Sequence, residues 1–449
     1  MPTACAATVL SDLKKRKYSE MNMFEYLKDI TDLAPFVGTK PFCGLRFNPI
    51  KLEKRVFERI APCELTPCTF YSCGYRIHDD SCGTYPLHMA GGYYIQEPSA
   101  MSAITALQVE PFDTVLDMCA APGSKSTAIA AHCDVLVSNE INPKRVMSLI
   151  SNIERMGVSN AIVTNSDSRV IAQNFEGYFD KVLVDSPCSG EGMFRRHPQI
   201  IENWSAELVE MCARRSSNIL KNAARTVKQG GRLVYSTCTY NLEENEMVIL
   251  DFLRNNPDFE LTDTGIPDCE KGFLGLDKAS RIFIKNGGEG HFVCAMRRTG
   301  AHTCKSKVQY FKVSDKTDFL SEVLCAPLKF YKNHDFGIIE HQGVKYAVHK
   351  KLPVPQGVRI MRAGVRLGCY TSKTFKPDHH LFMAARPSSF ETLETDEKSA
   401  CAFLNGQPLN VSSQLKGYVA VTYNGLTMGF GKASGAVLKN HYPHGLRTL

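Results

Sequence analysis

Two cysteines stand where predicted buried strands end, and both are candidates for covalent chemistry. Cys188 lies in the loop 185–196, which follows an apolar run, and Cys238 follows the apolar run 232–235. Short runs of this kind, rich in β-branched residues, are typical of buried parallel strands. The carboxyl ends of such strands meet at one edge of an open sheet, where ligands bind. We therefore expect both thiols and the carboxylate of Asp185 to face one crevice.

Two thiols beside a carboxylate suit the methylation of carbon 5 of a cytosine ring. That carbon becomes nucleophilic when a thiolate adds to carbon 6, and it can then attack a methyl sulfonium. A base must remove the proton from carbon 5 before the thiol leaves. The candidates for these catalytic roles are Cys238, Cys188 and Asp185. Each thiol alone is more typical of a buried structural cysteine, but their presence at two successive strand ends favours catalysis.

A small-residue loop at the first predicted strand end indicates a cofactor site. The strand 114–117 leads into the loop 118–126, and a helix is predicted from Thr127. Small residues let a ligand approach the backbone, and a helix N-terminus offers free N–H groups. Glu140 ends the second strand about 20 residues further on, a position that suits a bond to ribose hydroxyls. Asp167 follows the third strand, where it could contact an adenine amino group.

The alternation of strands and helices from about residue 95 predicts an α/β fold with a Rossmann-like, doubly wound sheet. A small α+β module precedes this core, and a β-rich region follows it. The strong hairpin signal Asn424-Gly425 belongs to that last region. The expected divisions are a flexible lead-in (1–20), an N-terminal α+β module (21–90), the α/β domain (91–298), a connecting domain (299–385) and a β-rich domain (386–449).

The flanking segments leave several interpretations open. Arg46, Lys51, Lys54 and Arg55 could contact RNA phosphates or form a solvated face. The basic and aromatic C-terminal tail is consistent with RNA contact, and a strand-rich stabilising appendage is the alternative. Asn241-Leu-Glu-Glu244 predicts a capping box that opens the next helix.

The composition favours a cytoplasmic protein that binds no membrane. The formal net charge of +7 favours anionic partners without requiring them. We find no secretory signal and no apolar run long enough to span a membrane. Seventeen scattered cysteines indicate a reducing compartment. The spacings of the cluster between Cys63 and Cys82 match no zinc pattern, so we expect no metal and assign that segment no function.

Four motifs resemble those of a known family. They are Gln96-Glu-Pro-Ser-Ala-Met101, Asp117-Met-Cys-Ala-Ala-Pro-Gly-Ser-Lys125, Asp185-Ser-Pro-Cys-Ser-Gly-Glu-Gly-Met193 and Tyr235-Ser-Thr-Cys-Thr-Tyr-Asn-Leu-Glu-Glu-Asn245. On these motifs the chain is similar to the Sun/Nol/Fmu family of S-adenosylmethionine-dependent RNA cytosine-5 methyltransferases. The opening stretch 44–51 and the closing stretches 429–432 and 439–447 resemble its bacterial RsmF-type branch, which acts on small-subunit ribosomal RNA.

The resemblance implies roles for individual residues. Cys238 would attack carbon 6, Cys188 would assist release of the product, and Asp185 would hold the cytosine edge. The implied S-adenosylmethionine contacts are Cys119, Ala120, Ala121, Pro122, Gly123, Ser124, Lys125, Glu140, Asp167 and Asp185, with Arg145 as a weaker candidate. The resemblance further implies an N-terminal RNA-binding module (21–90), a Rossmann-like S-adenosylmethionine-dependent methyltransferase domain (91–298) and a PUA-like RNA-binding domain (386–449). The implied partner is small-subunit ribosomal RNA or the small ribosomal subunit, and we expect a monomer. Ser186 stands where the family usually has alanine.

Four alternatives remain at this point. A DNA cytosine-5 methyltransferase uses a Pro-Cys thiol, which would make Cys188 the nucleophile. The substrate could be transfer RNA, or the chain could be a catalytically inert RNA-binding factor in ribosome assembly. A dinucleotide-dependent oxidoreductase is the generic α/β alternative, and the missing GxGxxG argues against it. The sequence does not identify the modified cytosine.

Overall fold

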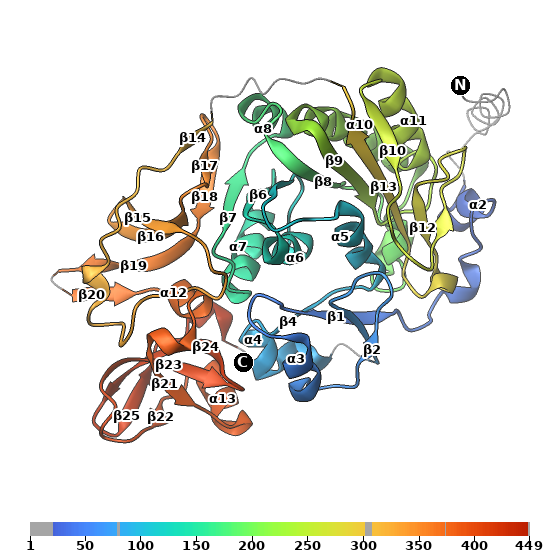
Figure 1. Ribbon diagram of the computed structural model, residues 1–449. Helices are drawn as coiled ribbons and strands as arrows, with labels where there is room; N and C mark the ends of the chain where they lie inside the picture. The colour runs from blue at the N-terminus through green and yellow to red at the C-terminus, as the bar shows by residue number, and fades with distance from the viewer. Residues whose placement is uncertain (1–20, 79–80, 301–307, 373, 448–449) are drawn as a thin grey trace.

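The computed structural model describes residues 21–78, 81–300, 308–372 and 374–447, so the predicted lead-in 1–20 lies outside the described residues. The described chain is built on a ten-stranded sheet in the order β11-β12-β13-β9-β8-β5-β6-β7-β18, with β10 paired to β13 (Figure 1). Its five parallel strands are β5 (Thr114–Asp117), β6 (Val135–Asn139), β7 (Ala161–Asn165), β8 (Phe179–Asp185) and β9 (Val227–Thr237). The antiparallel strands are β10 (Phe259–Thr262), β11 (Glu270–Lys271), β12 (Ser280–Ile282), β13 (His291–Arg298) and β18 (Arg359–Ala363). The predicted Rossmann-like α/β core is confirmed.

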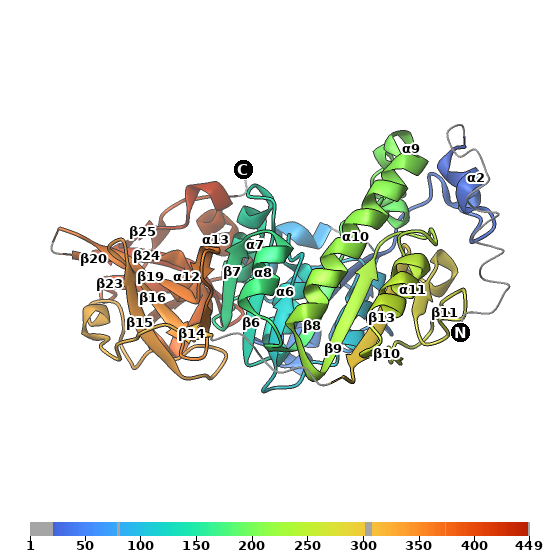
Figure 2. The same cartoon turned by 90° about the horizontal axis from the view of Figure 1, so that it is seen from above.

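Helices cover both faces of this sheet, which is why its parallel strands are apolar throughout. One face packs on α5 (Ser102–Leu107), α6 (Ser124–His132) and α7 (Arg145–Arg155). The other packs on α8 (Ser168–Asn174), α10 (Ala206–Thr226) and α11 (Glu246–Asn255) (Figures 1 and 2). Neighbouring residues of β5 show the alternation, because Val115 belongs to the first core and Leu116 to the second. Helix α9 (Gln199–Asn203) precedes α10.

Two helix starts differ from their predictions. Helix α6 begins at Ser124, three residues before the predicted Thr127, because Gly123 (φ +105°) already turns the chain into the helix. The predicted capping box does not open α11. The Asn241 side chain accepts the Glu244 N–H at 2.8 Å as predicted, but the Glu244 carboxylate turns away to the Ser189 N–H, and the helix begins at Glu246.

The N-terminal region forms a four-stranded sheet in the order β2-β3-β1-β4. Its elements are α2 (Met23–Leu27), β1 (Cys43–Phe47), α3 (Lys54–Ile60), β2 (Thr66–Pro67), β3 (Gly74–Ile77), α4 (Pro86–Met89) and β4 (Tyr93–Ile95). The last strand lies beyond the predicted boundary at residue 90. Helix α2 packs away from this sheet, against Phe194 and Trp204 of the core.

The four basic residues for which RNA contact was considered differ in burial, and two of them are not on the surface. Arg46 is 1% and Lys51 8% exposed, so neither the phosphate contact nor the solvated face holds for them. The Lys51 ammonium donates to the carbonyls of Ala90 and Arg155 at 2.8 and 3.2 Å. Burial, reinforced by the Arg155 charge, lowers the pKa of Lys51 to about 7. Lys54 and Arg55 are exposed as the solvated face requires.

The C-terminal third contains two smaller sheets and a two-stranded ribbon, β14 (Gln309–Tyr310) with β17 (Pro353–Val354). The first sheet has β15 (Phe336–His341), β16 (Val344–His349), β19 (Val365–Thr371) and β20 (Thr374–Pro377), followed by α12 (His379–Ala384). The second has β21 (Glu391–Glu394), β23 (Gly417–Tyr423), β24 (Leu426–Ser434), β25 (Val437–Asn440) and β22 (Leu409–Asn410), with α13 (Glu397–Leu404). The predicted hairpin at Asn424-Gly425 joins β23 to β24, and both residues have positive φ.

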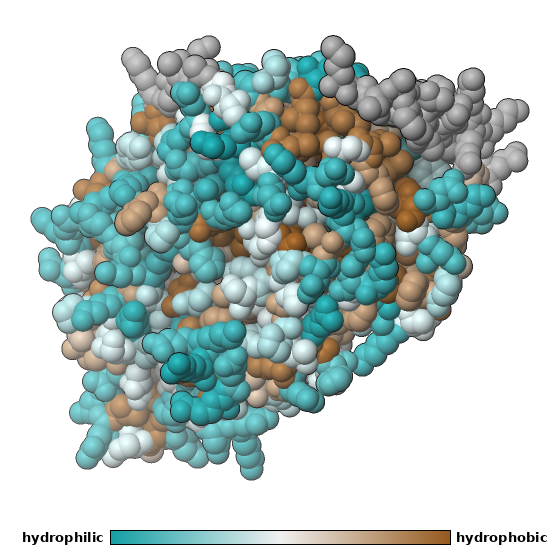
Figure 3. Space-filling view, turned by 45° about the vertical axis from the view of Figure 1, so that its right-hand side comes forward, coloured by the Kyte–Doolittle hydropathy of each residue, from teal (hydrophilic) through white to brown (hydrophobic). Residues whose placement is uncertain are grey.

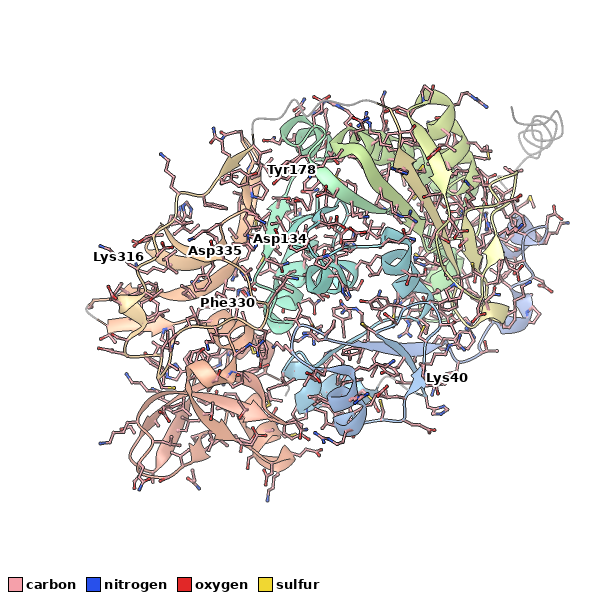
Figure 4. The ribbon with its side chains drawn as sticks, viewed as in Figure 1. Lys40, Asp134, Tyr178, Lys316, Phe330 and Asp335 are labelled. Atoms are coloured by element: carbon pink, nitrogen blue, oxygen red, sulfur yellow. The ribbon has the colours of Figure 1, made fainter. Side chains whose placement is uncertain are left out.

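This third is bonded to the core by strand pairing and by ion pairs. Strand β18 pairs with β7 and so extends the central sheet from beyond the predicted boundary at residue 298. Asp134, labelled in Figure 4, contacts His349 at 3.0 Å and Lys351 at 2.7 Å. The predicted domain boundaries themselves stay predictions.

The described helices and one face of the molecule can be compared with what a membrane span requires. Among the described residues, no helix combines the length and apolar character needed to span a bilayer. The face in Figure 3 is largely hydrophilic, and apolar side chains gather mainly towards its top.

Candidate active site

The two predicted catalytic thiols lie side by side. Strands β8 and β9 are parallel neighbours with Asp185 opposite Ser236, so the loops that follow them leave the sheet together. The Sγ atoms of Cys188 and Cys238 are 3.4 Å apart. The hydrogen bond between Cys188 and Cys238, together with burial, raises the pKa of Cys188 well above its usual value. Cys188 is therefore a protonated thiol at neutral pH in the free protein.

Asp185 lies in the same crevice and is held from two sides. Its Oδ2 accepts a hydrogen bond from Lys125 Nζ at 2.7 Å, and its Oδ1 accepts one from Ser236 Oγ at 2.8 Å. Burial by itself would raise the pKa of Asp185, but the Lys125 charge and the hydrogen bonds from Lys125 and Ser236 act against it, and the pKa lies below its usual value. The same pairing outweighs burial for Lys125 and raises its pKa. The pair is thus ionised, and it joins the loop 119–125, the predicted cofactor loop, to the strand end that leads to Cys188.

His291 is a neighbour of this pair that sequence reasoning missed. It begins β13, and the next residue, Phe292, pairs with Thr237, which precedes Cys238. The imidazole is buried and neither ring nitrogen has a hydrogen-bond partner. Burial, then the Lys125 charge, lowers the pKa of His291 to about 3, so the ring is neutral. Its only signal in the sequence is its place directly before the apolar run 292–295.

The loop from Cys119 to Lys125 is fixed in shape by its neighbours. The Ala120 N–H donates to the Asn139 carbonyl at 2.8 Å, Arg145 Nη2 to the Ala121 carbonyl at 2.6 Å, and Asn152 to the Pro122 carbonyl at 3.0 Å. Arg145 therefore supports the backbone of the loop. Its small side chains would let a ligand approach the backbone where helix α6 begins.

Carboxylates gather around this loop. Glu140 is 2% exposed, and Asp167 caps helix α8 further along the same edge. Asp117, which was not among the predicted contacts, has a buried Oδ1 without a hydrogen-bond partner. Burial, reinforced by Asp185, raises the pKa of Asp117 to about 7. Burial and the carboxylates of Asp117 and Glu140 raise the pKa of Cys119 well above its usual value. A cationic ligand would relieve this excess of negative charge, so the residues fit S-adenosylmethionine.

An arginine from the N-terminal sheet supports the loop from behind. Arg46 Nη2 donates to the Ser124 carbonyl at 2.6 Å and to the Thr127 hydroxyl, and its Nε donates to Gln96 Oε1 at 3.1 Å. Gln96 begins the motif 96–101, and through Arg46 it is connected to the start of α6. Sequence reasoning missed this role because Arg46 is remote from the loop along the chain.

Two other side chains lie near the site. Trp204 is buried, and its Nε1 donates to Glu191 Oε1 at 3.0 Å. The hydroxyl of Ser186, where the family usually has alanine, lies 2.7 Å from that of Ser216 on α10. No group of three or more His, Cys, Asp or Glu side chains in the described ranges is arranged to hold a metal ion.

Comparison with known proteins agrees with this architecture. The family model for the 16S rRNA methyltransferase RsmB/F matches residues 104–297. The model for the N-terminal domain of 16S rRNA methyltransferase RsmF matches residues 20–98, and that for the methyltransferase RsmF PUA domain matches residues 390–448. The three matches follow one another along the chain, and residues 298–389 lie between the last two of them.

Individual relatives extend the similarity. Ribosomal RNA small subunit methyltransferase F of Shewanella loihica is 34% identical over 442 residues, covering 90% of this chain and 88% of its own. Its counterpart in Aliivibrio fischeri is 31% identical over 434 residues, covering 90% of each. A solved methyltransferase homologue from Pyrococcus horikoshii is 26% identical with a TM-score of 0.53, covering 66% of this chain and 99% of that one. NSun6 from the same organism, 18% identical with a TM-score of 0.54, covers 63% of this chain and 99% of its own and shares the fold.

Fold and comparisons together define a Rossmann-like methyltransferase with a PUA domain. Within that class, the chain belongs to the ribosomal RNA small subunit methyltransferase F family.

Proposed function

We propose that this protein transfers a methyl group from S-adenosylmethionine to carbon 5 of cytosine in small-subunit ribosomal RNA. The observation that carries the proposal is the pair of thiols 3.4 Å apart beside the ionised Asp185. Membership of the family supports ribosomal RNA as the substrate and S-adenosylmethionine as the donor.

Cys238 supplies the nucleophile. Its sulfur adds to carbon 6 of the cytosine, and the electrons of the 5,6 double bond move to carbon 5. Asp185 receives the polar edge of the base, and Lys125 keeps that carboxylate in place. Bound S-adenosylmethionine supplies the electrophilic methyl group that carbon 5 takes up.

Cys188 serves the release step. Once Cys238 is bonded to carbon 6, its sulfur no longer sustains the hydrogen bond that raises the pKa of Cys188. Cys188 then loses its proton to water more readily, and its thiolate takes the proton from carbon 5. The electrons of that C–H bond restore the double bond, and the bond between carbon 6 and Cys238 breaks.

The flanking regions bind the RNA. The target base must leave its stack, at a cost of a few kcal/mol that RNA contacts elsewhere offset. We assign these contacts to the N-terminal module and the PUA-like region. The protein acts as a cytoplasmic monomer and binds no membrane.

Methyl transfer from labelled S-adenosylmethionine tests the proposal. We expect label in 5-methylcytidine when the acceptor is small-subunit RNA or the small ribosomal subunit, and none in matched DNA. Preferential labelling of transfer RNA would favour the transfer RNA alternative. Cofactor binding without methylation of any RNA would favour an inert assembly factor, and label on another base would contradict the chemistry.

A further inference from the structure

Two fully buried carboxylates lie near the thiols. Each belongs to the segment that carries one thiol and accepts hydrogen bonds from the segment that carries the other. Glu191 belongs to the loop that carries Cys188, and Glu244 belongs to the segment that begins with Cys238. Both have 0% exposure. We call them the crossed carboxylates.

Glu191 binds the Cys238 segment immediately after the thiol. Its Oε2 accepts hydrogen bonds from Thr239 Oγ1 at 2.5 Å, Tyr240 N at 2.8 Å and Asn241 N at 3.0 Å. These three residues follow Cys238 without a gap. The position of Cys238 therefore depends on a carboxylate supplied by the other loop.

Glu244 binds the Cys188 loop in the same manner. Its Oε2 accepts a hydrogen bond from the N–H of Ser189, the residue after Cys188, at 2.9 Å. Glu244 thus makes a backbone hydrogen bond to the Cys188 loop, whereas Glu191 makes its backbone hydrogen bonds to the segment after Cys238. Each carboxylate therefore holds the backbone next to a different thiol.

Two bridges join the halves of this arrangement. Asn241 Nδ2 donates to Glu191 Oε1 at 3.0 Å and to Glu244 Oε1 at 2.7 Å. The hydroxyls of Ser189 and Thr239, each next to a thiol, lie 2.8 Å apart. The bridges connect the segments directly behind the thiol pair.

The burial and the hydrogen bonds of the two carboxylates indicate that they position the thiol segments. Burying a carboxylate is costly unless hydrogen bonds compensate it, and an apolar side chain would fill the same space with less loss. Neither crossed carboxylate forms an ion pair with a lysine or arginine in the described part of the chain. Their hydrogen bonds go largely to the residues that follow the thiols.

We propose that the crossed carboxylates are positioning residues with separable effects. Glu191 holds Cys238 for adduct formation, and Glu244 holds Cys188 for product release. This inference rests on the proposed function, since it assigns the carboxylates to two steps of that reaction.

Trapping of the protein–RNA adduct under denaturing conditions separates the two steps. The full-length protein, S-adenosylmethionine and small-subunit RNA are mixed, and adduct is followed over a single turnover. For Glu244→Gln we expect adduct to form at the wild-type rate and to decay about tenfold more slowly, the effect of one lost hydrogen bond. For Glu191→Gln we expect adduct to form at least about tenfold more slowly.

Three further variants serve as controls. Glu243→Gln changes a neighbouring carboxylate that holds neither thiol loop, and it should behave as wild type. Glu244→Asp keeps the charge and should restore part of the release rate, which also decides the matter if Glu244→Gln does not fold. Cys188→Ala should accumulate adduct.

The outcomes distinguish this inference from the proposed function. If Cys188→Ala accumulates adduct while a folded Glu244→Gln releases product at the wild-type rate, the positioning role of Glu244 is wrong and the chemistry stands. Slowing of the same step by both glutamine variants would also overturn the inference. If Cys188→Ala accumulates no adduct, the proposed release mechanism itself fails.

Discussion

Asp185 stands between the cofactor loop and the thiols, and its partner Lys125 is only 7% exposed. Asp185→Asn would leave that ammonium buried without a counter-charge. We expect a loss of stability on the order of 2 kcal/mol, less than for a fully buried pair because Asp185 is 31% exposed. Methylation should fall as well.

Urea unfolding measures this loss. Glu210→Gln, which breaks the exposed pair with Arg214, is the control and should change stability by less than about 0.5 kcal/mol. Equal urea midpoints for Asp185→Asn and wild type would show that the Lys125–Asp185 ion pair contributes nothing to stability.

The carboxyl group of Glu244 makes the stability of the protein depend on pH. Burial, reinforced by Glu191, raises its pKa from 4.5 to about 7. Because the folded protein holds this proton more tightly than the unfolded chain, the group's contribution to stability is complete below pH 4.5 and is lost as the pH rises through 7. The full difference is roughly 3 kcal/mol.

The comparison of wild type with Glu244→Gln isolates this effect from other groups. Across pH 4.5 to 7, the stability of the wild type should fall relative to that of the variant. Parallel curves of unfolding free energy against pH would contradict a raised pKa.

Among the elements, the cofactor loop depends on a strand of another sheet. Arg46 of β1 donates to Ser124 and Thr127 at the start of α6. Arg46→Met should therefore weaken S-adenosylmethionine binding about tenfold, the effect of one lost charged hydrogen bond. Calorimetric titration measures the affinity for S-adenosylmethionine, with the exposed Arg55→Met as the control. An unchanged affinity in Arg46→Met would show that the loop does not depend on Arg46 of β1.

The elements that the sequence predicted are those with local signals. Strand β8 follows from its apolar run, and the hairpin at Asn424-Gly425 follows from residues that accept positive φ. Both thiols were also predicted to share a crevice, because parallel strands end at one sheet edge.

The rest depends on contacts between distant segments, which leave no local pattern. Arg46 and Lys51 resemble surface residues in sequence, and only the packing of β1 on the core buries them. Glu244 has the spacing of a capping residue, yet Ser189, from another loop, takes its carboxylate.

At the scale of the whole molecule, the central sheet is completed by the C-terminal third. Strand β18 covers the edge of β7, and Arg362 of β18 pairs with Glu154 at 2.5 Å. A chain that ends at residue 298 would expose β7 as an unpaired edge, which promotes association. We expect this fragment to self-associate in sedimentation and to melt below the full chain. A monomeric fragment of equal melting temperature would show that the regions are independent.

The measurement that tests the central claim most directly is adduct formation by wild type, Cys188→Ala and Cys238→Ala with S-adenosylmethionine and small-subunit RNA. The account predicts that Cys188→Ala accumulates a denaturant-resistant protein–RNA adduct and that Cys238→Ala forms none. The reverse pattern would make Cys188 the nucleophile, as in the DNA enzymes. Methylation by the wild type without adduct in any variant would contradict addition at carbon 6.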